Sequence, residues 1–249
     1  MIVIQTDHFV NKTVTECFAH GIKAEKVNIK DYKFNVADTI ASYGIKRGIG
    51  DLIKQSTNFF YMDHGYLSTS DRNFIAGKTN INAFDGYFRI VKNDFISIRP
   101  GQFNDDRLKN LKINFEELRT KGEYIILSEP SENIKNFFNL HNWIEETIKE
   151  LKKYSDRKII VHNKHSEISL DDLLENAWAF VSCQSTAGFK AMIKGVPAHF
   201  TYDSLKEINP ISNIENSIIN YEIFKNISYS QWTLREMFEG KIYNYIFEK

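Results

Sequence analysis

The chain has 249 residues, enough for one large domain or two small ones that each bury a core. Hydrophobic residues make up 42% and aromatic residues 14%, with only 4 prolines, which excludes a disordered or fibrous protein. Lys and Arg number 32, as do Asp and Glu, so no net charge draws the whole protein to nucleic acid or to an anionic membrane, although a local basic groove stays open.

The cysteine content and the N-terminal residues are typical of a protein in a reducing compartment. Cys17 and Cys183 lie far apart and make neither a disulfide framework nor a paired metal motif, and free thiols are typical of reducing compartments. The first residues predict a buried strand and lack the features of a signal peptide, and no apolar run approaches the roughly 20 residues of a membrane helix. We therefore expect a cytoplasmic protein without a membrane span.

The first half of the chain predicts alternating strands and helices. Apolar runs and their spacing predict strands over 1–5, 24–29, 39–43, 58–62, 87–91 and 95–98. A helix is predicted over 11–20, closed by Gly21, and a helical stretch ends at Gln55. The polar stretch 105–121 is predicted to be partly helical and to link two lobes.

The second half gives a clearer pattern. Strands are predicted over 124–127, 158–162, 178–182 and 198–201, and helices over 143–154, 169–176, 189–194 and 231–247. Ser169 and Asp172 resemble a capping box, and Gly195 is predicted to close the helix before it. The alternation predicts an α/β fold of two Rossmann-like lobes, with parallel sheets covered on both faces and a cleft between the lobes.

Hydroxyl and small side chains follow the strand predicted at 178–182. In open parallel sheets, ligands bind beyond the carboxyl ends of strands, where helix N-termini present amides and a partial positive charge. Ser185, Thr186 and Gly188 stand at such a place and would accept a diphosphate. Alternatively, Ser185 or Thr186 is an ordinary N-cap, which a helix needs without any ligand.

Two further loops are predicted at the same sheet edge. Ser128 follows the strand 124–127, and its hydroxyl faces the same crevice or belongs to an ordinary turn at Pro130. His162 and Lys164 follow the next strand, where they supply a cation to the same phosphates or form a solvated basic turn. Three loops at one edge favour a phosphate site more than any one of them alone.

The strand over 58–62 ends in a different polar group. Asp63 and His64 come next, and a carboxylate beside an imidazole can supply a general base near neutral pH. Neighbouring side chains on a strand point to opposite faces, so we expect only one to act, and a turn without function is the alternative. Lys46, Arg47 and Arg89 are candidate substrate contacts or surface charges. No GxGxxG, Walker, HExxH or paired-cysteine motif occurs, and no metal ion or cofactor is expected.

Three segments resemble known transferases. Residues 181–197, VSCQSTAGFKAMIKGVP, are similar to the donor-binding lobe of GT-B glycosyltransferases, where a strand, a Ser/Thr turn, a helix and a Gly-x-Pro turn hold the nucleotide diphosphate. Residues 59–66, FFYMDHGY, resemble the strand and His-Gly element of CDP-glycerol-dependent teichoic-acid polymerases and related capsule transferases, whose histidine is the proposed base. Residues 231–240, QWTLREMFEG, resemble the closing helix of small capsule- and phage-type glycosyltransferases.

The resemblance implies a compact GT-B-like, metal-independent glycosyltransferase. It implies an acceptor-side lobe over 1–110, a nucleotide-sugar-binding lobe over 122–228 and a terminal helix over 229–249 that packs back toward the first lobe. The donor would lie on Ser128, His162, Lys164, Ser185, Thr186 and Gly188. His64 or Asp63 would take the proton of the acceptor hydroxyl, which predicts inversion at the anomeric carbon.

The acceptor and the reaction type have alternatives at this stage. A surface glycan and a hydroxymethylated DNA base are both candidate acceptors, and the balanced charge leans against long duplex DNA. A nucleotide-sugar epimerase would need an acid/base pair across the sugar ring. A non-catalytic nucleotide- or glycan-binding protein on the same scaffold would bind donors without turnover.

Overall fold

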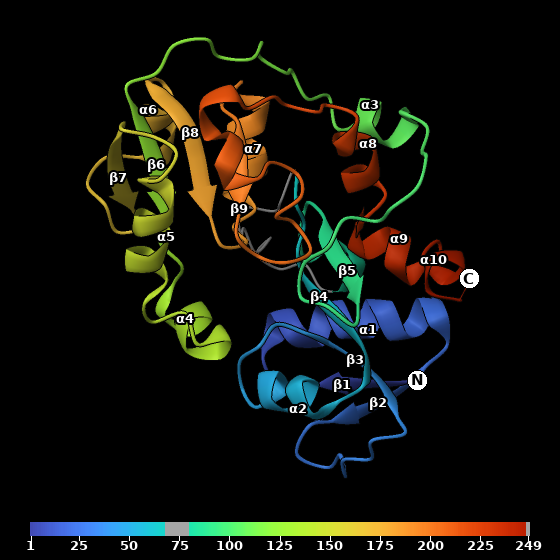
Figure 1. The fold of residues 1–249 in the computed structure, drawn as a ribbon. Helices are drawn as coiled ribbons and strands as arrows, with labels where there is room; N and C mark the ends of the chain where they lie inside the picture. The colour runs from blue at the N-terminus through green and yellow to red at the C-terminus, as the bar shows by residue number, and fades with distance from the viewer. Residues whose placement is uncertain (68–79, 248–249) are drawn as a thin grey trace. The chain divides into compact units, whose positions relative to one another are not determined.

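The computed structural model describes residues 1–67 and 80–247, and the chain divides into two compact units (Figure 1). The first unit consists of residues 1–103 and 226–249, and the second of residues 104–225. Each carries a sheet with parallel strands joined by helices. The predicted α/β class with two Rossmann-like units is confirmed.

The first unit is built on the sheet β10-β5-β4-β3-β1-β2, in which β5 and β10 run antiparallel and the other pairs are parallel. Its elements are β1 (Ile2–Gln5), α1 (Phe9–Ile22), β2 (Glu25–Asn28), β3 (Thr39–Tyr43), α2 (Ile49–Gln55), β4 (Asn58–His64), the 3-10 helix η1 (Asn80–Asn82), β5 (Phe88–Lys92), β10 (Gln231–Trp232), α9 (Leu234–Phe238) and α10 (Tyr243–Phe247).

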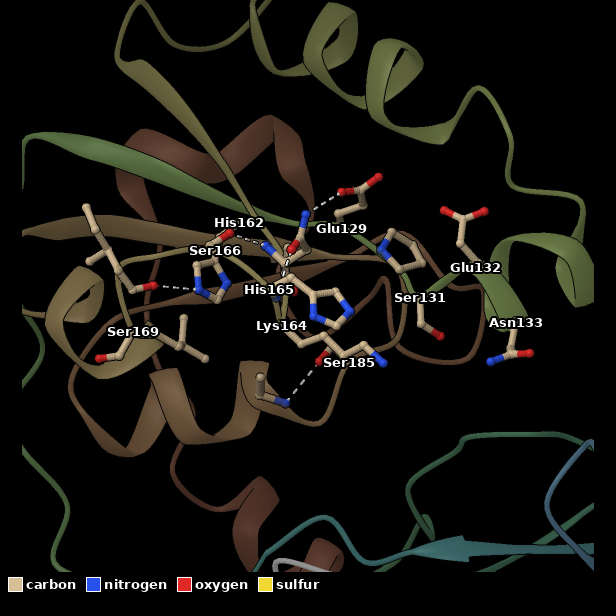
Figure 2. A pocket seen from close by; sticks show the side chains of 16 residues that line it. Glu129, Ser131, Glu132, Asn133, His162, Lys164, His165, Ser166, Ser169 and Ser185 are labelled. Carbon is tan, nitrogen blue, oxygen red and sulfur yellow. Dashed lines mark hydrogen bonds between the residues drawn. The ribbon is translucent and has the colours of Figure 1, made fainter.

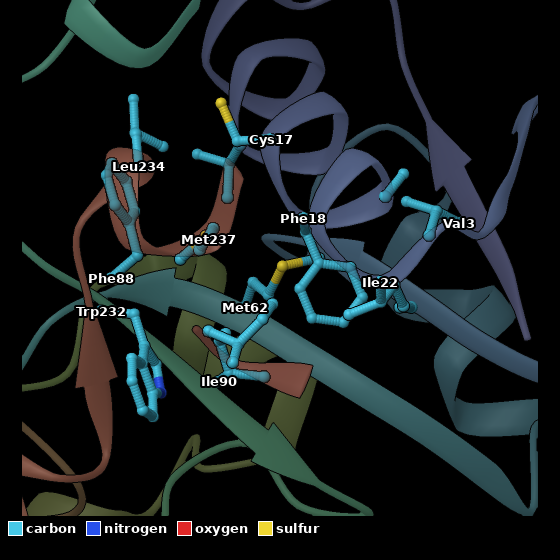
Figure 3. Close-up of a cluster of buried hydrophobic side chains, with 14 of the residues drawn as sticks. Val3, Cys17, Phe18, Ile22, Met62, Phe88, Ile90, Trp232, Leu234 and Met237 are labelled. Carbon is cyan, nitrogen blue, oxygen red and sulfur yellow. The ribbon is translucent and has the colours of Figure 1, made fainter. Parts of the chain in front are cut away.

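Alternate side chains of each strand point to opposite faces of this sheet, and each face carries a hydrophobic core. Val3 of β1 packs with Phe18 of α1 in one core, which Figure 3 shows together with Met62. Ile4 packs with Ile49 of α2 in a second core on the other face. The helices α1 and α2 therefore cover opposite faces, as predicted for a sheet of this class.

The second unit is built on the parallel sheet β7-β6-β8-β9. Its elements are α3 (Asp106–Asn110), β6 (Tyr124–Ser128), α4 (Glu132–Phe138), α5 (Trp143–Leu151), β7 (Lys158–His162), α6 (Leu170–Leu174), β8 (Ala177–Ser182), α7 (Ala187–Ile193), β9 (Ala198–Phe200) and the 3-10 helix η2 (Ile211–Asn216), and α8 (Ile223–Ser228) spans its boundary with the first unit.

Strand register brings the carboxyl ends of this sheet to one level. Ser128 at the end of β6 pairs with His162 of β7 on one side and with Ser182 of β8 on the other. The loops that follow these strands therefore start side by side. Ser169 caps α6 by accepting a hydrogen bond from the Asp172 amide, as its spacing predicted.

The predicted terminal helix over 229–249 is wrong in its secondary structure. Gln231 and Trp232 form strand β10, which pairs with β5, and the short helices α9 and α10 follow. Helix α9 begins with a capping box, in which Thr233 and Glu236 bond each other's backbone amides. These residues belong to the first unit, where α9 packs against α1.

Two smaller predictions also fail for packing reasons. Helix α1 does not close at Gly21 but continues to Ile22, with Lys23 as its left-handed C-cap. Gly21 instead allows close approach of α9, because a Cβ there would lie 1.8 Å from the Met237 carbonyl oxygen. Residues 95–98, which are all described, form no strand. The preceding strand β5 cannot pair with them, because both of its edges are already paired, one with β4 and the other with β10.

Candidate functional site

A pocket of about 590 Å³ opens at the carboxyl end of the sheet in the second unit (Figure 2). Its walls come from the loops that follow β6, β7 and β8. This is where ligands bind in parallel α/β sheets, and the volume lies within the range of small-molecule sites.

Four of the predicted donor-binding residues line this pocket. Ser128 comes from the end of β6, His162 and Lys164 from the end of β7, and Ser185 from the turn after β8. Lys164 is exposed and makes no ion pair with any described residue, so its ammonium is available to an anion. The sheet thus brings together side chains that are far apart in the sequence.

The start of α7 differs from the prediction. The Ala187 amide donates to Ser185 Oγ at 3.3 Å, so Ser185 acts as a capping acceptor, and the Gly188 amide donates to the Ser185 carbonyl at 3.0 Å. These amides are therefore already used, and α7 is only seven residues long. Neither Thr186 nor Gly188 lines the pocket, and a Cβ on Gly188 would lie 2.6 Å from the Phe200 ring. A ligand in this pocket would therefore contact side chains and not the amides of α7.

Sequence analysis missed a polar cross-link in the pocket wall. The Glu129 carboxylate accepts hydrogen bonds from Lys135 Nζ and, at 3.0 Å, from Asn163 Nδ2. The Lys135 bond holds the pKa of Glu129 below its usual value, so Glu129 is a carboxylate at neutral pH. It ties the β6–α4 loop to the β7–α6 loop, and its position directly after a predicted strand was the available signal.

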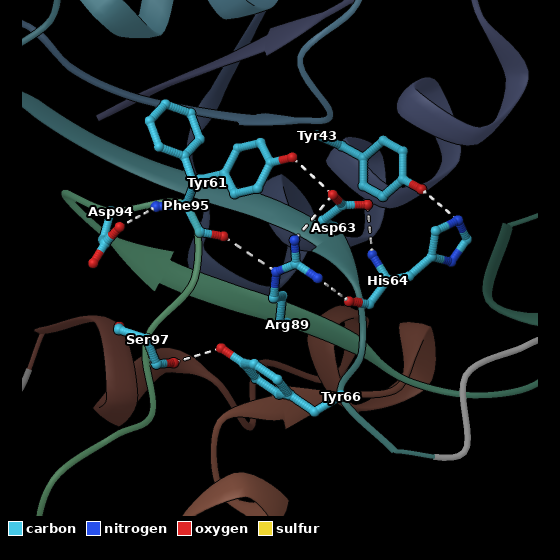
Figure 4. Close-up of polar contacts among 9 residues, drawn as sticks. All are labelled: Tyr43, Tyr61, Asp63, His64, Tyr66, Arg89, Asp94, Phe95 and Ser97. Atoms are coloured by element: carbon cyan, nitrogen blue, oxygen red, sulfur yellow. Dashed lines mark hydrogen bonds and ion pairs between the residues drawn. The ribbon is translucent and has the colours of Figure 1, made fainter. Parts of the chain in front are cut away.

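In the first unit, Asp63 forms a partly buried ion pair with Arg89, its cross-strand neighbour on β5 (Figure 4). The guanidinium Nη2 lies 3.1 Å from Asp63 Oδ2, and Tyr61 OH donates to the same oxygen at 2.8 Å. Burial raises the pKa of Tyr61 well above its usual value, which keeps this donor protonated. Because its oxygens are engaged in this way, Asp63 is poorly suited to act as a base.

Arg89 also uses its other donors within the unit. Nη1 donates to the His64 carbonyl at 2.8 Å and Nε to the Phe95 carbonyl at 3.2 Å. The Arg89 side chain is 11% exposed and its donors are used within the unit, so it is poorly placed to contact a substrate.

The half-buried His64 imidazole is held from several sides. The Tyr43 hydroxyl lies 3.1 Å from His64 Nε2, and the Phe88 ring stacks on the imidazole with centroids 5.9 Å apart. The His64 amide donates to Asp63 Oδ1 at 2.8 Å. These contacts fix the orientation of the ring, as a general base requires.

The glycine after His64 has a packing role. A Cβ on Gly65 would lie 2.8 Å from both the Tyr87 carbonyl oxygen and Gln231 Oε1. Gly65 therefore accommodates β10 and the residue before β5. This packing explains the glycine without any approach of a substrate to the backbone.

Lys46 and Arg47 lie on the exposed turn between β3 and α2. The pKa of His8, which precedes α1, is lowered by partial burial and by the positive charges of Arg47 and then Lys46. The two cations therefore stand near the start of α1, and contact with a substrate remains a prediction.

The fold is similar to that of a solved bacterial transferase. The structure titled "Thermosulfurimonas dismutans KpsC, beta Kdo 2,4 transferase" matches with a TM-score of 0.50 and 11% sequence identity, over 92% of this chain and 90% of that chain. "Thermosulfurimonas dismutans KpsC, beta Kdo 2,7 transferase" matches with a TM-score of 0.48 and 11% identity, over 98% and 100% of the two chains. No protein-family model matches the sequence, and a search of curated proteins found no significant match. The likeness concerns the fold alone and rests on the first of these structures.

Two searches of the described residues came out negative. Within 1–67 and 80–247, no group of three or more His, Cys, Asp or Glu side chains is placed to hold a metal ion. Over the same residues, no helix has both the length and the hydropathy needed to cross a membrane.

Proposed function

We propose that the chain is a glycosyltransferase that binds a nucleotide-activated sugar in the pocket of the second unit and moves the sugar to an acceptor hydroxyl. One observation carries the proposal: Ser128, His162, Lys164 and Ser185, which come from three strand ends, line a single pocket of about 590 Å³. The likeness of fold to a Kdo transferase supports the same reaction class.

In this proposal, Lys164 binds the phosphates of the donor. Its exposed ammonium is a cation without an ion-pair partner among the described residues, and it projects from the pocket wall (Figure 2). Charge-assisted bonds to phosphate are the stronger class of hydrogen bond, and the hydroxyls of Ser128 and Ser185 add neutral donors. A cation at this position stabilises the charge that develops on the leaving phosphate, and this is the basis for proposing a metal-independent transfer.

His64 of the first unit is the proposed general base. An imidazole held by Tyr43 and Phe88 has the chemistry to take a proton from an acceptor hydroxyl near neutral pH. Asp63 is engaged by Arg89 and Tyr61, which favours His64 over Asp63 for this role. Direct attack by the activated hydroxyl would invert the anomeric carbon, and a glycan or a modified base could supply that hydroxyl.

Thermal shift with nucleoside diphosphates and nucleotide sugars tests the binding step. A ligand at 100 times its dissociation constant stabilises the folded protein by about 2.7 kcal/mol. We expect at least one nucleotide to raise the melting temperature, and Lys164→Met to reduce that shift. Lys149→Met, which removes an exposed charge from α5 outside the pocket, is the matched control and should leave the shift unchanged. No shift with any nucleotide, or equal shifts in both variants, would contradict the proposal.

A further inference from the structure

His162 is a buried polar side chain in the wall of the pocket, with 9% of its surface exposed. Its Nε2 lies 3.2 Å from the Ile168 carbonyl oxygen. A carbonyl oxygen only accepts hydrogen bonds, so Nε2 carries the hydrogen and donates. This bond holds the β7–α6 loop against the end of β7.

The other ring nitrogen is left as an acceptor. In a neutral imidazole with a hydrogen on Nε2, Nδ1 carries a lone pair. No residue in the described ranges donates to His162 Nδ1, and Figure 2 shows this nitrogen on the side of the ring turned toward Lys164 and His165, away from its bonded partner. Nδ1 is not one of the fully buried atoms without a partner, so it is the part of this largely buried ring that a ligand in the pocket can reach and donate a hydrogen bond to.

Lys164 in the same pocket calls for a different ligand group from His162. Its ammonium needs an anion, whereas His162 Nδ1 needs an N–H or O–H group. A nucleotide carries both, since it joins a phosphate to a ribose with hydroxyls and to a base with N–H groups. Inorganic phosphate or pyrophosphate would pair with the cation but would offer no nucleoside donor to His162 Nδ1.

We infer that His162 determines the specificity of the pocket for the nucleoside part of its ligand, with Nδ1 accepting a hydrogen bond from a ribose hydroxyl or from an amino group of the base. This inference rests on the proposed function and adds to it the residue that distinguishes a nucleotide from a bare phosphate. Loss of this hydrogen bond between the pocket and the nucleoside should weaken nucleotide binding by roughly tenfold.

Two substitutions separate the loop contact from the acceptor. His162→Gln places an amide nitrogen near the position of Nε2, so it keeps a donor for the Ile168 carbonyl but removes the acceptor at Nδ1. His162→Asn places an amide oxygen near the position of Nδ1 and gives up the Ile168 bond. His141→Gln, an exposed histidine of the same unit outside the pocket, is the matched control.

The experiment is calorimetric titration of the full chain at pH 8 with CDP, UDP, 2′,3′-dideoxy-CDP and pyrophosphate, with circular dichroism melts to check folding. We expect His162→Gln to weaken CDP binding by roughly tenfold and to leave pyrophosphate binding unchanged, while His162→Asn and His141→Gln bind CDP within a few-fold of wild type. A lower affinity of wild type for dideoxy-CDP identifies a ribose hydroxyl as the donor, and a lower affinity for UDP identifies the amino group of cytosine.

The outcomes separate this inference from the proposed function. If wild type binds nucleotides and His162→Gln binds CDP equally well, the inference is overturned and the proposed function stands. Binding of pyrophosphate as tight as that of every nucleotide also overturns the inference. If wild type binds none of the four compounds and no other nucleotide raises its melting temperature, the proposed function fails and the inference fails with it.

Discussion

Arg89 and Asp63 neutralise each other inside the first unit, with side chains 11% and 28% exposed. Removing one partner leaves the other charge without compensation in a poorly hydrated place, which is far costlier than losing a surface pair. Arg89→Met should therefore lower the free energy of unfolding by about 3 kcal/mol. Urea unfolding monitored by circular dichroism measures the change.

Arg235→Met is the control for that substitution. Arg235 is exposed on α9, and its guanidinium lies 3.8 Å from Glu239, so its removal should cost less than about 1 kcal/mol. A loss for Arg89→Met no larger than the loss for Arg235→Met would show that the partly buried pair does not hold this part of the sheet.

The buried His199 should make the stability of the protein depend on pH. It is fully buried on β9, where Nδ1 faces the carbonyl oxygens of Asn209 and Pro210, and Ser217 Oγ lies 2.8 Å from Nε2. Burial lowers the pKa of His199 to about 4, from an ordinary value of 6.5 for histidine. The unfolded chain therefore binds this proton first as the pH falls, so stability is lost between about pH 6.5 and 4, by about 3 kcal/mol in all.

Chemical denaturation at pH 7.5 and at pH 4.5 measures this loss. In His199→Gln the unfolding free energy should change less between the two pH values than in wild type, because the titrating group is gone. His141→Gln removes an exposed histidine and should keep the wild-type difference. If His199→Gln shows the full wild-type difference, other groups cause the loss of stability.

At the scale of elements, α1 and α9 meet at Gly21. A glycine-to-alanine change inside an open helix stabilises by up to about 1 kcal/mol, since alanine is the better helix former. At Gly21 the added Cβ would lie 1.8 Å from the Met237 carbonyl oxygen, so one helix must move. Gly21→Ala should destabilise the protein by about 2 kcal/mol, against no more than a few tenths for the exposed Lys12→Ala on the same helix. A stabilised Gly21→Ala variant would contradict this packing.

The regular strands could be predicted from sequence because their signal is local. The apolar runs of β1, β4, β6 and β8 lie where strands were expected, since parallel strands buried on both faces read as continuous hydrophobic runs. Strand β10 could not be found in this way, because Gln231 and Trp232 become a strand only by pairing with β5, far away in the chain. The seven-residue helix α4 was missed for a similar reason, since it is too short to show a period.

At the scale of the whole molecule, part of the candidate site followed from topology. Residues after parallel strands share one edge of the sheet, so Ser128, His162, Lys164 and Ser185 could be grouped without coordinates. The partners of Asp63 could not be predicted from the sequence, because its ion pair with Arg89 depends on the register of β4 and β5. The sequence suggested that free amides at the start of α7 would bind a diphosphate. It could not show that the Ala187 amide already donates to Ser185 Oγ.

Turnover separates the proposed roles of the two units. His64→Ala should lower the rate of sugar transfer by 10²-fold or more while donor binding, measured by calorimetry, stays at the wild-type value. Lys164→Met should weaken donor binding. If His64→Ala keeps the wild-type rate, His64 is not the base.

We propose the pocket at the ends of β6, β7 and β8 as the nucleotide site. Amide chemical-shift mapping of the full chain, titrated with the nucleotide that gives the largest thermal shift, locates the bound ligand directly. We expect the largest changes at the residues that line the pocket, which are 128–133, 162–166, 168–170, 185 and 187. Saturable changes confined to the smaller pocket at 81–86 and 233–235 of the first unit would contradict it.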